Sequence, residues 1–223
     1  MDAHPAEPPH DCPRCPRLVD YRAVNRGAHP DWWNAPVRGW GDPAAWLCVV
    51  GLAPGVTGAN RTGRPFTGDH AGLLLYATLA RFGLSRGTFD ARPDDGLALD
   101  GVFISNAVRC VPPENKPTPA EVHTCRPFLA AQLAMLPNLR VVLALGAIAH
   151  QSAVKALGGR LPKLPFAHGA VHRVPSGLVL VDSYHCSRYN TNTGRLTPAM
   201  FEAAFAAALA QRDVQPRSAT TRD

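Results

Sequence analysis

The feature that most constrains this chain is a glycine-rich stretch from Gly51 to Gly72, which reads GLAPGVTGANRTGRPFTGDHAG. It follows an apolar, β-prone run at 46–50 and precedes an apolar run without helix breakers at 73–80, which predicts a strand-to-helix loop. Glycine lets a backbone take left-handed angles and come close to a ligand, and the N–H groups at the following helix start favour an anion or a polarised carbonyl. Because the pattern G-x-x-x-x-G-K-S/T is absent, the stretch predicts a binding loop other than a nucleotide P-loop.

Strands and helices alternate along the rest of the chain. Short apolar runs predict four parallel strands, at Leu47–Gly51, Val102–Asn106, Arg140–Leu145 and Leu178–Asp182. Helical patterns accompany them at 17–26, 72–82, 120–136, 147–157 and 198–211, and the runs 166–174 and 177–181 predict a hairpin. The predicted fold is α/β, a three-layer α/β/α sandwich around a mainly parallel four-stranded sheet. Ligands of such sheets bind at the carboxyl ends of the strands, so the glycine-rich stretch, Asn106 and His185 are expected to meet there.

Size and charge set broad limits on the class of protein. A chain of 223 residues, 46% hydrophobic, can bury one sizeable core, so we expect a single domain over 1–223, with about 1–11 and 212–223 flexible. The net charge of +6 is compatible with a polyanionic partner. No apolar run approaches membrane length and the first residues lack the pattern of a secretion signal, so we expect a cytoplasmic protein without a membrane partner. A monomer is also expected.

Six cysteines in a chain without a secretion signal favour metal or redox chemistry over disulfides. Cys12 and Cys15 form a C-x-x-C pair, and fourteen residues separate Cys110 from Cys125. Four thiolates can hold either a zinc ion or a 4Fe-4S cluster, and spacing alone does not separate the two. Cys48 lies inside an apolar run and is expected to be an inert buried thiol.

Several separate motifs follow one another in a specific order. They are GLAPG from Gly51, GRPFTGD from Gly63, SNAVRC from Ser105, HCSRYN from His185 and TGRLT from Thr193. In this combination the chain resembles the uracil-DNA glycosylase superfamily, and within it the iron–sulfur-containing family 5 more than family 4. The resemblance extends from Cys12 to about Leu209. It favours a 4Fe-4S cluster over zinc, with the ligands Cys12, Cys15, Cys110 and Cys125.

The resemblance also implies a substrate pocket. A glycosylase takes its target base out of the stack, reads the Watson–Crick edge and stabilises the departing base. Asn106 can donate to uracil O4 and accept from N3, and it occupies the family's pyrimidine-reading position; Phe66 corresponds to the ring that stacks on the flipped base. His185 matches the histidine that donates a hydrogen bond to the developing oxyanion. Gly51, Ala53 and Gly55 are predicted to bind substrate beside them.

The source of water activation is a separate question. Many superfamily members carry a carboxylate or amide just after the first motif, whereas Val56, Thr57 and Gly58 offer none, as is usual in family 5. The resemblance then gives a catalytic role to Asp69, which is also suited to capping the helix that follows it, and the two roles are compatible. Cys186, next to His185, is interpreted as a packing residue rather than a redox-sensitive thiol, because the reaction needs no thiol nucleophile.

The segment after His185 is predicted to bind DNA. Arg188, Tyr189, Asn190 and Arg195 could contact phosphates and fill the gap left by a flipped nucleotide, with Arg188 or Tyr189 as first candidates for the wedge. Arg195 suits a phosphate or an intramolecular contact.

The predicted function is therefore removal of uracil from DNA, leaving an abasic site, by a nucleoid-associated enzyme. Hypoxanthine and other deaminated bases are expected as further substrates. The alternative is a catalytically inactive Fe–S module for nucleic-acid binding or redox sensing. The joint presence of Phe66, Asp69, Asn106 and His185 favours the enzyme, because a sensor needs none of them.

Overall fold

A computed structural model describes residues 6–213 of the chain. Its centre is a six-stranded sheet with the strand order β1-β5-β2-β6-β8-β7. The inner four strands are parallel to one another, and β1 and β7 pair antiparallel at the two edges. The bounds are β1 Trp40–Gly41, β2 Leu47–Gly51, β5 Val102–Asn106, β6 Val141–Leu145, β7 Val171–Arg173 and β8 Val179–Ser183.

The four predicted parallel strands are all present, but the predicted four-stranded sheet gains two short edge strands. β1 has two residues and β7 has three, too few for an alternating pattern to be recognised in the sequence. β7 lies within the predicted hairpin and pairs with β8 as expected. A separate two-stranded sheet joins β3, Ser85–Arg86, to β4, Ala98–Leu99, and had no counterpart in the prediction.

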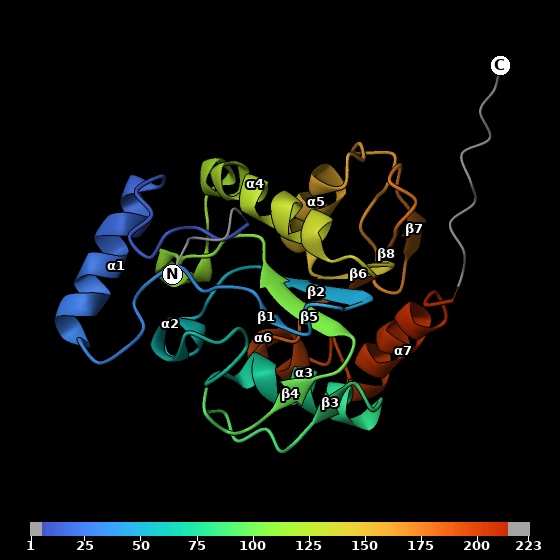
Figure 1. The fold of residues 1–223 in the computed structure, drawn as a ribbon, viewed down its shortest axis with the longest axis horizontal. Helices are drawn as coiled ribbons and strands as arrows, with labels where there is room; N and C mark the ends of the chain where they lie inside the picture. Colours follow the sequence, from blue (N-terminus) through green and yellow to red (C-terminus); the bar gives the residue numbers. More distant parts are fainter. Residues whose placement is uncertain (1–5, 214–223) are drawn as a thin grey trace.

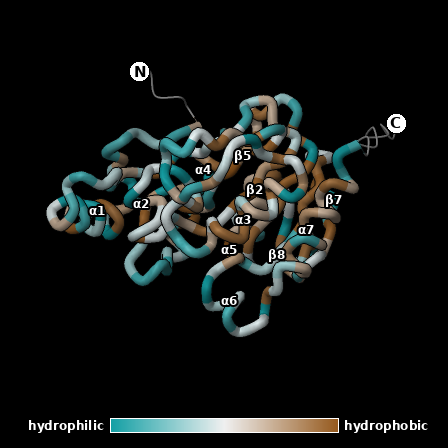
Figure 2. Tube along the Cα trace, turned by 90° about the horizontal axis from the view of Figure 1, so that it is seen from below, coloured by the Kyte–Doolittle hydropathy of each residue, from teal (hydrophilic) through white to brown (hydrophobic). Residues whose placement is uncertain are grey.

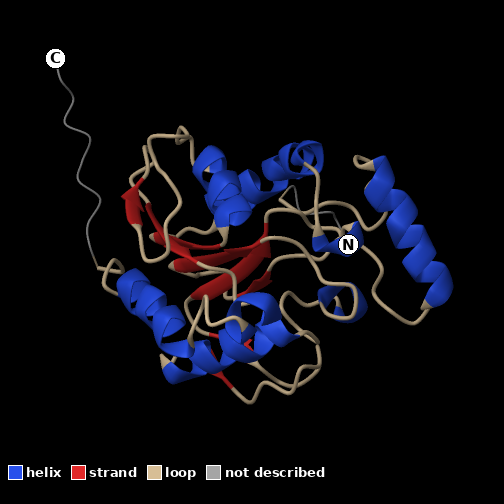
Figure 3. Ribbon diagram, turned by 180° about the vertical axis from the view of Figure 1, so that it is seen from behind, coloured by secondary structure: helices blue, strands red, loops and turns tan. Residues whose placement is uncertain are grey.

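Helices cover both faces of the sheet, which confirms the three-layer sandwich (Figures 1 and 3). The helices α4 and α5 pack on one face, and α3 and α7 pack on the other. The short elements α2, α6 and the 3₁₀ helix η1 were not predicted, since one turn carries no periodicity. The bounds are α1 Pro16–Ala28, α2 Ala59–Thr62, α3 His70–Arg81, η1 Pro113–Asn115, α4 Pro119–Met135, α5 Ala147–Ala156, α6 Arg188–Asn192 and α7 Pro198–Leu209.

The core follows from strands that are buried on both sides. Along β2, Leu47 and Val49 pack into the cluster under α3 and α7, whereas Cys48 and Val50 pack into the cluster under α4 and α5. Such strands read as continuous apolar runs because neither face meets water. Figure 2 shows the hydrophobic stretches gathered around the sheet and hydrophilic ones at the periphery, as in α6. Cys48 is completely buried, as expected for a packing thiol.

The ends of the described chain pack against the sandwich. Ala6 is 1% exposed, and Glu7 accepts a hydrogen bond from the backbone N–H of Gly39 at 3.0 Å. At the other end, the guanidinium of Arg212 lies 5.3 Å from the ring centroid of Trp46. These contacts do not test the expectation that about 1–11 and 212–223 are flexible, and 1–5 and 214–223 fall outside the described residues. Within 6–213 no helix is long and apolar enough to cross a membrane.

Candidate active site

The carboxyl edge of the parallel strands holds a small pocket. Chain segments more than a hundred residues apart meet there, as the order of strands and helices predicts. The pocket opens into a wider groove that shares Ala53, Gly55, Asp69 and His185 with it and adds Asn115 and Arg188 at its rim. The residues that line the pocket are Ala53, Pro54, Gly55, Ala59, Phe66, Asp69, Asn106 and His185.

Phe66 forms one wall of this pocket in a conformation that the surrounding glycines make possible. Its φ is +53°, in the left-handed region that residues other than glycine rarely adopt. A Cβ at Gly72 would collide with the carbonyl oxygen of Phe66, and a Cβ at Gly51 would lie 2.5 Å from both Phe66 Cζ and Asn106 Oδ1. The predicted substrate-binding Gly51 therefore contributes by letting Phe66 and Asn106 pack tightly beneath the pocket.

A buried ion pair, which sequence analysis did not detect, braces the loop that carries Phe66. Arg64 donates to both carboxylate oxygens of Asp95 at 2.7 Å, and its Nε donates to Thr67 Oγ1 at 2.8 Å. Tyr76 adds a hydrogen bond from its hydroxyl to Pro65 O at 2.6 Å. The hydrogen bonds from Arg64 hold the pKa of Asp95 well below its usual range. No motif links Arg64 to an aspartate thirty-one residues later, so only the fold reveals this pair.

Asn106 ends β5 and is 3% exposed. Its side-chain amide makes no hydrogen bond within residues 6–213 and lines the pocket. Burying an amide without partners is costly, so this amide is poised for a ligand that accepts and donates at adjacent atoms.

His185 follows the end of β8 and faces Phe66 across the pocket. The two ring centroids are 5.9 Å apart with 25° between the ring planes. Its backbone carbonyl accepts from Asn190 Nδ2 at 2.8 Å, which fixes the turn after the strand. Burial lowers the pKa of His185 to about 4, so the imidazole is neutral near pH 7 and carries one N–H donor.

Asp69 combines the two interpretations that its sequence context allowed. It is the N-cap of α3, where its Oδ1 accepts from the backbone N–H of Gly72 at 3.3 Å. It also lines both the pocket and the groove, and a Cβ at Gly58 would collide with its carboxylate. Burial raises the pKa of Asp69 above its ordinary value. The helix cap thus presents this carboxyl group to the pocket.

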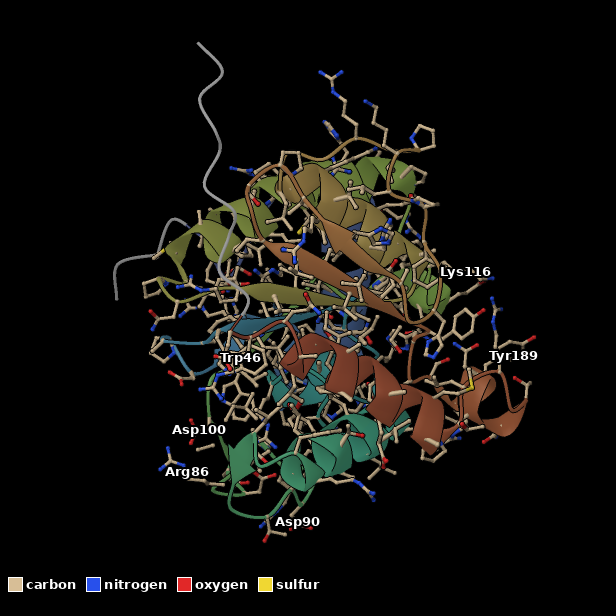
Figure 4. All side chains as sticks on the ribbon, turned by 90° about the vertical axis from the view of Figure 1, so that its right-hand side faces the viewer. Trp46, Arg86, Asp90, Asp100, Lys116 and Tyr189 are labelled. Atoms are coloured by element: carbon tan, nitrogen blue, oxygen red, sulfur yellow. The ribbon has the colours of Figure 1, made fainter. Side chains whose placement is uncertain are left out.

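The four predicted DNA-contacting residues separate into two pairs. Tyr189 is 71% exposed and projects into solvent from α6 (Figure 4), and Arg188 lines the groove. Asn190 is engaged with the carbonyl of His185, and the guanidinium of Arg195 lies 4.7 Å from the ring centroid of Tyr184. Arg188 and Tyr189 are therefore presented outward, whereas Asn190 and Arg195 make contacts within the protein.

Cys186 is fully buried among the residues packed under α3 and α7. Burial raises the pKa of this thiol far above its ordinary value, so it stays protonated. This environment agrees with a packing residue.

The other four cysteines meet at a second place, near α1. Cys12, Cys110 and Cys125 belong to one buried cluster, against which Cys15 packs, and the four thiols line a small, almost wholly apolar cavity. Burial raises the pKa of Cys110 to about 12 and that of Cys125 to about 11, so these thiols need a bound cation to ionise.

The surroundings of these thiols suit a negatively charged group. Arg22 is 3% exposed and has no carboxylate partner within the described residues; it donates to Cys110 Sγ at 3.1 Å and to Cys12 O at 2.9 Å. The backbone N–H of Arg109 donates to Cys125 Sγ at 3.3 Å. A buried guanidinium is costly without an anion, and thiolates bound to a metal centre supply one.

The spacing of the four thiols can be compared with the spacing that a bound zinc ion requires. In the described part of the chain, only His150, His172 and Asp182 form a group of three or more potential metal-ligand atoms within 4.8 Å of one another. Around a tetrahedral zinc, Zn–S bonds of about 2.3 Å place sulfur atoms about 3.8 Å apart. No three of the four thiol sulfurs all lie within 4.8 Å of one another in the described structure.

A buried network involving Asp182 is the main feature that sequence analysis missed. His150 Nδ1 lies 2.7 Å from Asp182 Oδ1, and His172 Nε2 lies 3.1 Å from Asp182 Oδ2. The other nitrogen of His150, Nε2, lies 2.8 Å from Leu164 O. Both histidines are thereby held within the fold rather than presented to solvent. The one sequence signal is an acid inside an apolar strand run, because such an acid requires a buried partner.

Comparisons with known proteins bear on this site. A family model described as the uracil DNA glycosylase superfamily matches residues 38–209. The chain is 47% identical over 195 residues to a type-5 uracil-DNA glycosylase of Thermus thermophilus, covering 85% of this chain and 89% of that one. It is 43% identical over 192 residues to a type-5 uracil-DNA glycosylase of Pyrobaculum aerophilum, covering 84% and 83% of the two chains.

A type-4 uracil-DNA glycosylase of Pyrobaculum aerophilum is less similar, at 35% identity over 164 residues, with 73% of this chain and 69% of that one covered. The preference for family 5 over family 4 that the motifs indicated thus agrees with the identities. With the family model spanning most of the chain and the pocket residues gathered at one sheet edge, the chain belongs to the uracil DNA glycosylase superfamily.

Proposed function

We propose that this chain is a type-5 uracil-DNA glycosylase, which hydrolyses the N-glycosidic bond of uracil in DNA and leaves an abasic site without cutting the strand. The observation that carries the proposal is the convergence of Phe66, Asn106 and His185 on one pocket at the carboxyl edge of the sheet. The type-5 relatives, named as uracil-DNA glycosylases, support it.

The pocket residues match the needs of the reaction. The flipped base would stack on Phe66 while the free amide of Asn106 pairs with O4 and N3. As the bond between C1′ and N1 breaks, its electron pair leaves with the base, and negative charge grows on the uracil oxygens. Neutral His185 donates its N–H to that charge, and a donor fixed in advance is worth on the order of 3 kcal/mol in the transition state.

Water completes the reaction by adding its oxygen to C1′ of the sugar, and the proton that it gives up neutralises the departed uracil anion. Asp69 is the carboxyl group at the pocket rim, and its charge would orient the water and stabilise the cationic sugar. It lies in the part of the pocket that continues into the groove, where water has access. Asp69 therefore combines the helix cap with a catalytic role in this proposal.

The cofactor we propose is a 4Fe-4S cluster held by Cys12, Cys15, Cys110 and Cys125. The gathering of the four thiols around one cavity and the guanidinium of Arg22, which has no carboxylate partner within residues 6–213 and donates to Cys110 Sγ, support it. The hydrolysis transfers no electrons, so its contribution would be to join the N-terminal segment to residues 110–125. Protein made with iron should be brown and contain about four irons per chain. A colourless, fully active preparation with one zinc per chain would contradict this proposal.

The proposed partner is double-stranded DNA. Helix α6 presents Arg188 and Tyr189 to it beside the pocket. Tyr189, which is 71% exposed, and Arg188, which lines the groove, are the candidates for the wedge that fills the space of a flipped nucleotide. An enzyme with this substrate would work on the nucleoid.

The test is release of uracil from a duplex with a single U·G pair, read as strand breakage after alkali treatment. A duplex with T·A at the same position is the matched control. We expect breakage of the uracil strand only, and no breakage across pH and salt would overturn the proposed function. A hypoxanthine-containing duplex in the same assay measures the broader range, for which slower release is expected.

A further inference from the structure

The end of β5 and the residues that follow it, segment 106–110, connect the base pocket to the cysteine site. Asn106 lines the pocket, and Cys110 is one of the four clustered thiols. Between them, the backbone N–H of Ala107 donates to the carbonyl oxygen of Gly51 at 2.9 Å. The place of the Asn106 amide in the pocket therefore depends on how this segment is held.

Arg109 anchors the segment in the protein interior, where its side chain is 1% exposed. Its Nη2 donates to Gln132 Oε1 on α4, whereas its Nε and Nη1 have no hydrogen-bond partner within residues 6–213. A guanidinium stays charged in proteins, and a buried charge is costly unless an opposite charge lies close to it. The packing of Arg109 thus requires an anion beside it.

Glu7 supplies this anion from the other end of the chain. Its Oε2 lies 3.4 Å from Arg109 Nη1, and the Glu7 side chain is 11% exposed. Its Oε1 accepts hydrogen bonds from the backbone N–H of Gly39, at 3.0 Å, and from Gln132 Nε2. Within residues 6–213, Glu7 is the only carboxylate paired with Arg109. The carboxylate is therefore held in place and its charge is matched to one buried cation.

Residues 6–12, which we call the strap, carry a second acid in a different setting. Asp11 has a side chain that is 70% exposed, and it pairs at 3.0 Å with Arg26, which is 46% exposed. Exposed pairs of this kind contribute little to stability because water and salt screen them. The two acids of the strap thus offer a buried charge contact and a surface contact for comparison.

We propose that Glu7 is a positioning residue for recognition of the base. By neutralising Arg109 it fixes segment 106–110, and this holds the Asn106 amide at its place in the pocket. Without the charge of Glu7, the protein relieves the unpaired cation by displacing the segment, and Asn106, three residues from Arg109, moves with it. Docking of the strap is thereby a condition for a formed pocket. The inference rests on the proposed function for the identity of the base.

The first test is an NMR titration of Glu7→Gln with free uracil, well below the melting temperature of the variant. Glutamine keeps an oxygen for the N–H of Gly39, so the substitution removes mainly the charge. The side-chain amide signal of Asn106 should shift, and uracil should bind about tenfold more weakly, the loss expected for one hydrogen bond to the ligand. A merely structural Glu7 would lower the melting temperature but leave both readouts of the folded protein unchanged.

Asp11→Asn is the matched control, since it removes the exposed acid of the same strap. This variant should show the Asn106 signal and the uracil affinity of the unmodified protein. If Glu7→Gln also shows both unchanged, the inference is wrong.

The second test removes the cation as well. Losing one partner of a buried ion pair is destabilising, whereas replacing both partners by uncharged groups is often neutral. A chain with Glu7→Gln and Arg109→Met should therefore melt at a higher temperature and bind uracil more tightly than Glu7→Gln alone. Should Glu7→Gln fail to fold, recovery of a folded, uracil-binding protein in the double variant gives the same answer. No recovery in the double variant would contradict charge compensation by Glu7.

Failure of this inference is distinguishable from failure of the proposed function. Absence of uracil release by the unmodified protein would overturn the proposed function, and the Asn106 signal of Glu7→Gln would still report whether the strap positions the segment. Normal uracil release, with an unmoved Asn106 signal and unchanged uracil affinity in Glu7→Gln, would overturn only the role of Glu7.

Discussion

Two histidine–aspartate pairs near the carboxyl ends of the strands are built for opposite purposes. His150 and Asp182 are completely buried and hydrogen-bonded to each other at 2.7 Å. His185 and Asp69 line one pocket, yet no hydrogen bond joins them in the described structure. His150 and Asp182, the closed pair, hydrogen-bond to each other. His185 and Asp69, the open pair, leave polar atoms available to a ligand.

The neighbours of each ring set its charge. Both nitrogens of His150 face acceptor oxygens, of Asp182 and Leu164, an arrangement that favours the doubly protonated, cationic ring. Burial alone would lower the pKa of His150, but the hydrogen bond and charge of Asp182 outweigh it and the pKa is raised. His185 has only the burial, which keeps it neutral. The ring of His150 is fully engaged within the protein, whereas the ring of His185 keeps its N–H available, as its proposed catalytic role requires.

The largest expected effect is on stability. Asp182→Ala leaves a buried cation without its anion, so the free energy of unfolding should fall by about 3–5 kcal/mol. Asp69→Ala, in the open pair, removes only a helix cap and should cost about 1 kcal/mol. Urea denaturation of both variants measures the contrast. Equal, small losses would show that the closed pair is not the ionic structure described.

The next effect is on the reaction. His185→Ala should lower the single-turnover rate of uracil release by about a hundredfold to a thousandfold, since it removes the donor to the departing base. His150→Ala, assayed at a temperature where it remains folded, should keep nearly the unmodified rate. The mechanism would be untenable if His185→Ala released uracil at full speed.

Asp69→Asn then tests the charge of the Asp69 carboxylate separately from its role as a helix cap. Asparagine caps a helix about as well as aspartate, so stability should be unchanged. The single-turnover rate should nevertheless fall by about a hundredfold if the carboxylate assists the water. Unchanged rates on uracil and hypoxanthine duplexes would reduce Asp69 to its capping role.

The smallest effect is the dependence of stability on pH, which should have opposite signs for the two histidines. The pKa of His150 is raised, so its stabilisation is complete below the unfolded value of about 6.5 and is lost as pH rises through the folded pKa. The pKa of His185 is lowered to about 4, so its contribution is present above about pH 6.5 and is lost as pH falls toward 4. Unfolding free energies of His150→Gln and His185→Gln from pH 4 to 9 measure both slopes, and slopes of one sign would contradict the assignment.

Sequence analysis predicted the open pair but not the closed one, for a physical reason. Phe66, Asp69, Asn106 and His185 stand in motifs at strand ends, and parallel strands bring such ends together. The pairs His150–Asp182 and Arg64–Asp95 depend on which side chains face each other across packed layers, and no local pattern records that. The short elements α6 and η1 were missed likewise, because their shape comes from capping and from contacts such as that of Arg17 with Lys116 O.

The central claim is that the pocket between Phe66, Asn106 and His185 holds the excised base. The direct measurement is titration of isotope-labelled protein with free uracil, followed through the NMR signals of the Asn106 side-chain amide and the ring of each histidine. The account predicts that the signals of Asn106 and His185 move together while those of His150 and His172 stay in place. Uracil-dependent shifts confined to other residues, with Asn106 and His185 unmoved, would contradict it.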